Sequence, residues 1–62
     1  MPFIEVKAFD TRWESPEKTA ELIERITKAM ADTFGEQVGR ETEVVLIGVP
    51  RPQWGFGGKA RI

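Results

Sequence analysis

One helix pattern lies between two strand patterns, and this order constrains the fold more than any other feature of the sequence. Ile4, Val6 and Ala8 occupy every second position of residues 3–9, which is the period of a strand with two different faces. Residues 43–49 contain a continuous aliphatic run, typical of a strand buried on both faces in a parallel sheet. A strand, a helix and a strand in this order predict a right-handed β-α-β unit with parallel strands.

The segment between Ser15 and Gly35 carries the start and stop signals of a single helix. Ser15 can accept a hydrogen bond from a free backbone amide, and Pro16 suits the first helical position, where its missing N–H is not needed. We expect the helix to run to about Phe34 and to stop at Gly35. Apolar residues recur along it at three- and four-residue steps and predict one core-facing stripe. They are Leu22, Ile23, Ile26, Met30 and Phe34.

The remaining segments predict connections and a hairpin. Residues 36–42 are polar and contain Gly39, so we expect a loop there. Residues 50–59 contain two prolines, which exclude a central strand, and glycines that permit turns with positive φ. We expect a C-terminal hairpin that carries Trp54 and Phe56, either as an arm packed on a neighbouring copy or as the apolar wall of a site.

The chain of 62 residues predicts one domain, 1–62, with a marginal core. A domain of this size buries only about 60% of the surface of its unfolded chain and usually needs a disulfide, a metal or a partner chain. The sequence has no Cys and no His, which excludes disulfides, the common zinc sites, Cys nucleophiles and His-based triads. Because one helix covers only one face of a two-stranded sheet, we expect oligomerisation.

Charge and hydropathy exclude two classes of partner. Nine basic and ten acidic residues give a net charge of −1, which argues against a nucleic-acid binder with a basic stripe. No apolar run approaches the roughly 20 residues of a membrane span, and Glu5 and Lys7 interrupt the first strand too early for a signal peptide. We therefore expect a cytoplasmic protein without membrane contact, cofactor or metal.

The Met1-Pro2 start offers one unusual chemical group. Removal of an initiator methionine before a small residue would leave Pro2 with a free secondary amine, a candidate general acid or base. The first position of a strand tolerates proline, and the strand would hold the amine in place although most chain termini fray. The alternative is that Pro2 simply begins a strand.

Arg12 and Trp13 allow two interpretations just before the helix. In the first, Arg12 is solvated and Trp13 packs over the end of the helix. In the second, Arg12 binds a carboxylate, for which its planar guanidinium is well suited.

The motifs at the two ends of the chain complete a family resemblance. Met1-Pro2 begins a hydrophobic strand, an arginine follows ten residues after the proline, and Trp54-Gly55-Phe56-Gly57-Gly58 follows the aliphatic second strand. In this combination, nearly the whole chain resembles the 4-oxalocrotonate tautomerase family. The resemblance implies an α+β fold with a β-α-β protomer, paired into a four-stranded sheet with helices on one side, and three such dimers in a hexamer.

The resemblance also implies roles for named residues. Pro2 would be the general base and acid that moves a proton in an unsaturated 2-hydroxy or 2-oxo acid, from dienol to enone. An α-amino group titrates near about 7.7–8.0, and burial among aromatic side chains would lower this pKa. Arg12, counted from Pro2, matches the family arginine that binds a substrate carboxylate; counted back from the helix, that place is Glu14. Trp54 takes the place of the aromatic wall, with Phe56 beside it.

One position departs from the family pattern. The second family arginine, early in the second strand, aligns with Glu43, whose carboxylate cannot bind an anionic substrate. Several accounts are open. In one, Arg51 or Arg40 of a neighbouring subunit would substitute for this arginine, and in another a related subunit of a hetero-oligomer would supply it. Alternatively, Glu43 activates water in a hydratase-like or dehalogenase-like enzyme, or the chain is an inactive oligomeric packing module. The exact substrate and the removal of Met1 do not follow from the sequence.

Overall fold

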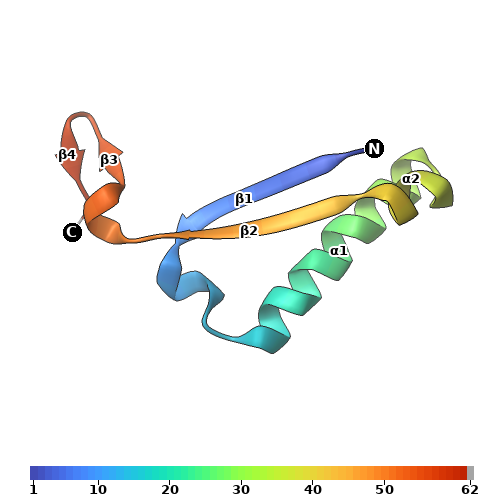
Figure 1. The fold of residues 1–62 in the computed structure, drawn as a ribbon, viewed down its shortest axis with the longest axis horizontal. Coiled ribbons are helices and arrows are strands. Elements are labelled where there is room, and N and C mark those ends of the chain that lie inside the picture. The colour runs from blue at the N-terminus through green and yellow to red at the C-terminus, as the bar shows by residue number, and fades with distance from the viewer. Residues whose placement is uncertain (62) are drawn as a thin grey trace.

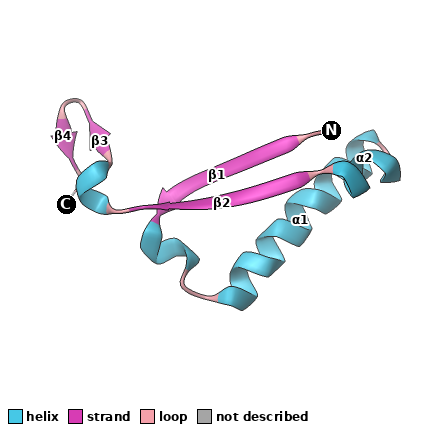
Figure 2. Cartoon of the chain, viewed as in Figure 1, coloured by secondary structure: helices cyan, strands magenta, loops and turns pink. Residues whose placement is uncertain are grey.

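Two parallel strands and one long helix form the body of the protein, whose computed structural model describes residues 1–61 (Figure 1). The strands β1 (Phe3–Phe9) and β2 (Glu43–Val49) lie side by side, and α1 (Pro16–Phe34) connects them (Figure 2). The predicted β-α-β unit with parallel strands is therefore confirmed.

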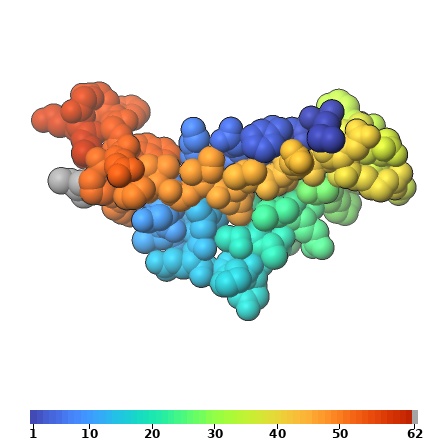
Figure 3. Space-filling view, in the orientation of Figure 1, coloured from blue at the N-terminus to red at the C-terminus, as the bar shows by residue number. Residues whose placement is uncertain are grey.

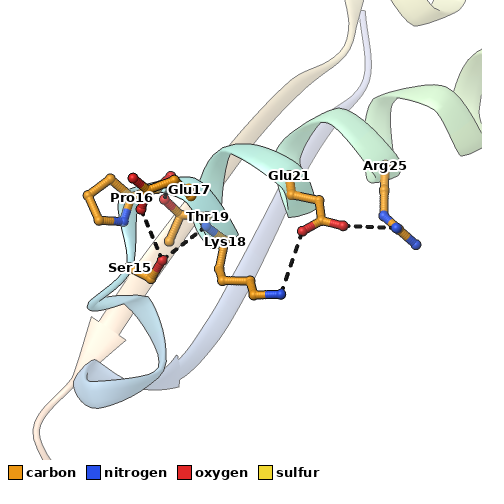
Figure 4. Close-up of polar contacts among 7 residues, drawn as sticks. All are labelled: Ser15, Pro16, Glu17, Lys18, Thr19, Glu21 and Arg25. Carbon is orange, nitrogen blue, oxygen red and sulfur yellow. Dashed lines mark hydrogen bonds and ion pairs between the residues drawn. The ribbon is translucent and has the colours of Figure 1, made fainter.

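The helix α1 begins and ends at the predicted residues because both of its ends are capped. The Ser15 hydroxyl accepts a hydrogen bond from the Lys18 amide at 3.2 Å, and Pro16 follows it in the first turn (Figure 4). At the other end Gly35 has φ of 107°, in the region that favours glycine, and its N–H donates to the Ala31 carbonyl at 2.8 Å.

The outward side of α1 carries ion pairs that water screens. Glu21 lies 2.8 Å from Arg25 and 3.9 Å from Lys18 (Figure 4). Lys28 donates a hydrogen bond of 2.8 Å to Asp32, and this bond together with the opposite charge raises the pKa of Lys28. Exposed pairs of this kind contribute little to stability, so this side of the helix is a solvated surface.

Residues 36–42 do not form the loop that we expected, because most of them form a second helix, α2 (Glu36–Glu41). Gly39 determines how closely α2 packs against α1. It is the only fully buried residue of the described chain, and a Cβ placed on it would lie 2.6 Å from the Cβ of Ala31. Gly39 thus lets α2 pack closely against α1, and it is a packing residue where the sequence suggested a loop glycine.

The two faces of the sheet are covered differently. Half-buried residues form the side toward α1, namely Ile4, Val6, Val44 and Leu46. Because successive side chains of a strand point to opposite faces, the odd-numbered residues form the other side, which we call the bare face. They are Phe3, Glu5, Lys7 and Phe9 of β1 and Glu43, Val45, Ile47 and Val49 of β2. On this face Phe3 is 57% exposed and Val45 is 39% exposed.

A single chain does not close a hydrophobic core. Among the described residues no apolar side chain is fully buried. Ile23 is 37% exposed and Phe34 is 65% exposed, so the prediction that the whole apolar stripe of α1 lies in the core is wrong for one chain alone. The prediction that β2 is buried on both faces is wrong for the same reason, since Val45 faces solvent.

A short hairpin follows β2, as predicted. It is made of the helical turn η2 (Arg51–Gln53) and the antiparallel strands β3 (Gly55–Phe56) and β4 (Lys59–Ala60). Gly57 and Gly58 form its turn with φ of 59° and 83°, a region in which side chains are strained. The Arg61 N–H donates to the Trp54 carbonyl at 2.7 Å, which ties the end of the hairpin to its beginning.

No helix in residues 1–61 is long and apolar enough to cross a membrane.

Replacing Gly39 with alanine should destabilise the protein by about 1–3 kcal/mol, because the added methyl group would overlap Ala31. Urea unfolding followed by circular dichroism measures the change. Gln37→Ala is the matched control, since Gln37 is exposed on the same helix and its loss should cost less than about 0.5 kcal/mol. Equal unfolding midpoints for the Gly39 variant and the wild type would show that the close helix contact is not required.

Candidate functional site

Pro2 and Glu43 are neighbours at the amino ends of the two parallel strands. The Glu43 N–H donates to the Pro2 carbonyl at 2.9 Å, and the next residue, Phe3, pairs with Glu43 in the sheet register. Pro2 is half-buried, whereas Met1 is 87% exposed. Loss of Met1 would therefore remove little packing, and strand pairing would keep the Pro2 nitrogen in place beside Glu43.

An aromatic and cationic cluster lies at the carboxyl ends of the same strands. The rings of Phe9 and Trp54 are 5.0 Å apart between centroids, with an angle of 59° between their planes. The guanidinium carbon of Arg51 lies 4.4 Å from the centroid of the Phe9 ring, which is a cation–π contact. Arg51 is thus held against the aromatic pair while it remains exposed to solvent.

A pocket of about 310 Å³ opens beside this cluster. It is lined by Phe9, Trp54, Phe56 and Arg61. Trp54 also borders a second hollow of about 290 Å³ that reaches Lys7. Apolar rings with cations at the margin suit a small organic anion, because the rings exclude water and the cations compensate the charge.

Arg61 lines this pocket although the sequence did not single it out. The family motif ends at Gly58, and a cation placed after it looks like an ordinary surface residue. Its position after the predicted hairpin was the signal that could have found it. The second strand of a hairpin ends beside the start of the first, so Arg61 lies next to Trp54. The Arg61 N–H donates to the Trp54 carbonyl at 2.7 Å.

Arg12 lies at the same end of the sheet, in the helical turn η1 (Asp10–Trp13). Its neighbour Trp13 anchors this turn, because the indole N–H donates to the Ile47 carbonyl at 3.0 Å. The ring also fits over Gly48, where a Cβ would lie 3.4 Å from Trp13 Cδ1. Arg12 is exposed and makes no ion pair with any other residue of the described chain.

The candidate site residues fall into two groups at opposite ends of the sheet. Figure 1 shows the N-terminus beside α2 and the hairpin at the far end of the strands. The seven residues of β1 lie between the groups and span about 23 Å. One chain therefore does not bring Pro2 and the cluster of Arg12, Arg51, Trp54 and Phe56 to the same small molecule.

Arg40, the other cation considered as a substitute, lies on α2 and is engaged locally. Its guanidinium donates to Gln37 Oε1 at 3.2 Å and lies 3.9 Å from a Glu36 carboxylate oxygen. It borders a hollow of about 450 Å³ between α1 and α2, which is lined by side chains of both charge signs. Neither Pro2 nor the aromatic cluster lines this hollow.

In the described part of the chain, no three acidic, His or Cys side chains are grouped so that they could hold a metal ion.

Comparison with known proteins places this geometry in a family. The family model described as "Tautomerase enzyme" matches residues 2–60. A solved structure from a study of the 4-oxalocrotonate tautomerase isozymes of Methylibium petroleiphilum is 27% identical, with a TM-score of 0.76, and the match covers 97% of this chain and 92% of that chain. The crystal structure of a 4-oxalocrotonate tautomerase homologue is 33% identical, with a TM-score of 0.77, over 97% and 90% of the two chains. No protein with a curated description matches the chain.

The family match begins at Pro2 and runs through both strands, the two helices and the hairpin. It thus includes both groups of candidate site residues, with the proline at its first position. The chain belongs to the tautomerase family.

Proposed function

We propose that the protein is a tautomerase of the 4-oxalocrotonate type, which moves a proton within an unsaturated 2-hydroxy or 2-oxo acid. The observation that carries the proposal is the position of Pro2. It is the first residue of the family match, a backbone hydrogen bond from Glu43 holds it at the start of β1, and it follows a highly exposed Met1. Removal of Met1 frees the secondary amine that the reaction needs.

The neutral Pro2 amine acts first as a base and then as an acid. It takes the hydroxyl proton of the dienol, the double bonds shift along the carbon chain, and the resulting ammonium returns the proton to a carbon atom. One O–H bond breaks and one C–H bond forms, so no electrons are gained or lost overall. A base whose pKa lies close to the working pH serves both steps.

The cluster at the other end of the sheet supplies substrate binding in this proposal. Arg12 and Arg51 bind carboxylate oxygens, for which the planar guanidinium is suited. Trp54 and Phe56 form the apolar wall around the unsaturated carbon chain. Arg51 supplies the second positive charge, because the Glu43 carboxylate cannot bind an anionic substrate. The contact of Arg51 with Phe9 holds its guanidinium near the wall.

The site is completed by a second copy of the chain or by a related chain. Pro2 lies about one strand length from the binding cluster of its own chain, so a neighbouring subunit must bring its cluster to this proline. In a monomer, a substrate bound at the cluster would lie out of reach of the Pro2 amine of the same chain.

Glu43 supports a second candidate function. Its exposed position beside Pro2 would let its carboxylate activate a water molecule, which would make the enzyme a hydratase or a dehalogenase-like member of the family. The two functions differ in their products. Tautomerisation gives an isomer of the substrate, whereas hydration adds one oxygen atom, which mass spectrometry in ¹⁸O-labelled water detects.

Replacing Trp54 with alanine should lower the rate at subsaturating substrate by about tenfold or more, because the apolar wall is lost. The same change opens the site to water and should raise the pKa of the Pro2 amine, so the acid limb of the pH–rate profile should move to higher pH. Trp54→Phe is the matched control, since it keeps an aromatic wall. An unchanged profile in Trp54→Ala would contradict the proposed position of this side chain.

Replacing Pro2 with alanine should lower the rate at neutral pH by about 10²–10⁴-fold, the usual contribution of one acid–base group. The fold should persist, since alanine is acceptable at the start of a strand. In the wild type the rate should rise with pH through the titration of the amine, because only its neutral form accepts the first proton. The sharp control is protein that retains Met1, verified by intact mass. Full activity of that form would rule out the proline mechanism.

A further inference from the structure

The C-terminal hairpin carries its rings on one strand and its cations on the other. Phe56 of β3 pairs with Lys59 of β4, and at the open end of the hairpin the Arg61 N–H donates to the Trp54 carbonyl at 2.7 Å. Trp54 is extended, with φ of −108° and ψ of 111°, so the strand geometry continues to this end. Directly opposite residues of an antiparallel pair share a face, and so do alternate residues of one strand. The two rings of the first strand therefore lie on the same face as the two cations of the second.

This arrangement gives the pocket at the hairpin a positive charge that no acidic lining residue balances. The pocket is lined by Phe9, Trp54, Phe56 and Arg61. Residues 50–61 contain three basic and no acidic residues, although the whole chain has a net charge of −1. The hollow between α1 and α2 differs, because side chains of both charge signs line it. A guanidinium beside apolar rings suits an anionic group on a flat carbon skeleton.

The Arg61 side chain is available to such a ligand. It is exposed, and it makes no ion pair with another residue between positions 1 and 61. The backbone hydrogen bond to Trp54 fixes its main chain, so the guanidinium stays close to the rings. Figure 3 shows the hairpin, in red, at one end of the molecule, apart from the green atoms of α1.

Arg51 lies at the same end of the molecule but is placed differently. Its guanidinium carbon lies 4.4 Å from the centroid of the Phe9 ring, in a contact that already uses its charge. It does not line the pocket, whereas Arg61 does. Arg61 is thus the cation of the pocket itself.

We propose that Arg61 is a further carboxylate-binding residue, which holds the acid group of a ligand whose planar carbon chain lies against Trp54 and Phe56. That the natural ligand is an unsaturated 2-hydroxy or 2-oxo acid rests on the proposed function, whereas the pocket and its charge do not. In the reaction, Arg61 adds one contact to those of Arg12 and Arg51. The carboxylate keeps its charge while the proton moves, so this contact is equally strong before and during the transfer. Such uniform binding lowers KM and leaves kcat little changed.

An inert acid tests the contact without the reaction. The probe trans-cinnamate has a planar unsaturated chain and a carboxylate but no oxo or hydroxyl group, and cinnamamide has the same shape without the charge. The chain has two tryptophans, so a spectrum of Trp54→Phe identifies the indole N–H signal of Trp54. NMR titration of that signal measures both affinities. The wild type should bind cinnamate more tightly than cinnamamide, and equal affinities would overturn the proposal.

Arg61→Ala should weaken the binding of cinnamate about fivefold or more and leave the binding of cinnamamide unchanged, because one charge-assisted hydrogen bond is lost. Arg61→Lys should keep part of the preference, since the charge remains but the planar fork of donors does not. Both variants keep the backbone hydrogen bond to Trp54, and circular dichroism verifies the fold. Wild-type affinity of Arg61→Ala for cinnamate, or an equal loss for both probes, would overturn the proposal.

Arg25→Ala is the matched control for the charge. It removes the same guanidinium from the exposed side of α1, where Arg25 pairs with Glu21 at 2.8 Å. Its affinity for cinnamate should equal that of the wild type. A loss as large as that of Arg61→Ala would show that only the total charge of the protein matters, which would contradict a local contact.

Kinetics separates this proposal from the proposed reaction. With phenylenolpyruvate, which is cinnamate with a hydroxyl group at carbon 2, Arg61→Ala should raise KM about fivefold or more and change kcat by less than about twofold. An unchanged KM would overturn the proposed role of Arg61. A wild type that binds cinnamate through Arg61 but does not tautomerise any 2-hydroxy acid would refute the proposed function and leave the Arg61 contact established.

Discussion

A two-stranded sheet with one long helix cannot enclose its own core, and the rest of this protein depends on that constraint. The helix α1 covers one face, which leaves Phe3 and Val45 exposed on the other, and Phe34 at the end of α1 is also exposed. The chain has no disulfide that could compensate. Small domains with so little buried surface gain stability from partner chains. We therefore propose that the chain works as part of an oligomer in which another subunit covers the exposed surface.

The same constraint governs the chemistry. Parallel strands place their amino ends together and their carboxyl ends together, so Pro2 and the cluster around Phe9 lie at opposite ends of the sheet. In the proposed function, a second chain completes the site when it brings its cluster to this proline. Stability and activity are then expected to be lost together when subunits separate.

The sequence predicts this fold well where the determinants are local. The helix ends follow from Ser15, Pro16 and Gly35, whose capping depends only on near neighbours in the chain. Gly39 was misjudged because its role depends on contact with Ala31 eight residues earlier, which a loop signal does not reveal. A stripe of apolar residues likewise shows which side of a helix avoids water, but not whether the same chain covers it.

The site was less predictable than the fold, for a physical reason. Family resemblance pointed to Pro2, Arg12 and Trp54, and nothing in their spacing indicates that they lie at opposite ends of the sheet. Arg61 reaches the pocket through the return of the hairpin, a contact that the motif does not encode. The resemblance predicts an arginine where this chain has Glu43, and in the proposed site Arg51 supplies the missing positive charge.

The most direct measurement is complementation between two inactive chains. Pro2→Ala removes the base, and a chain with both Arg12 and Trp54 replaced by alanine removes the binding cluster. Mixed pairs contain one intact site, built from the proline of one chain and the cluster of the other. The account predicts that co-assembly of the two chains restores activity from about a quarter of the sites if pairing is random. Activity no greater than the sum of the two separate variants would contradict it.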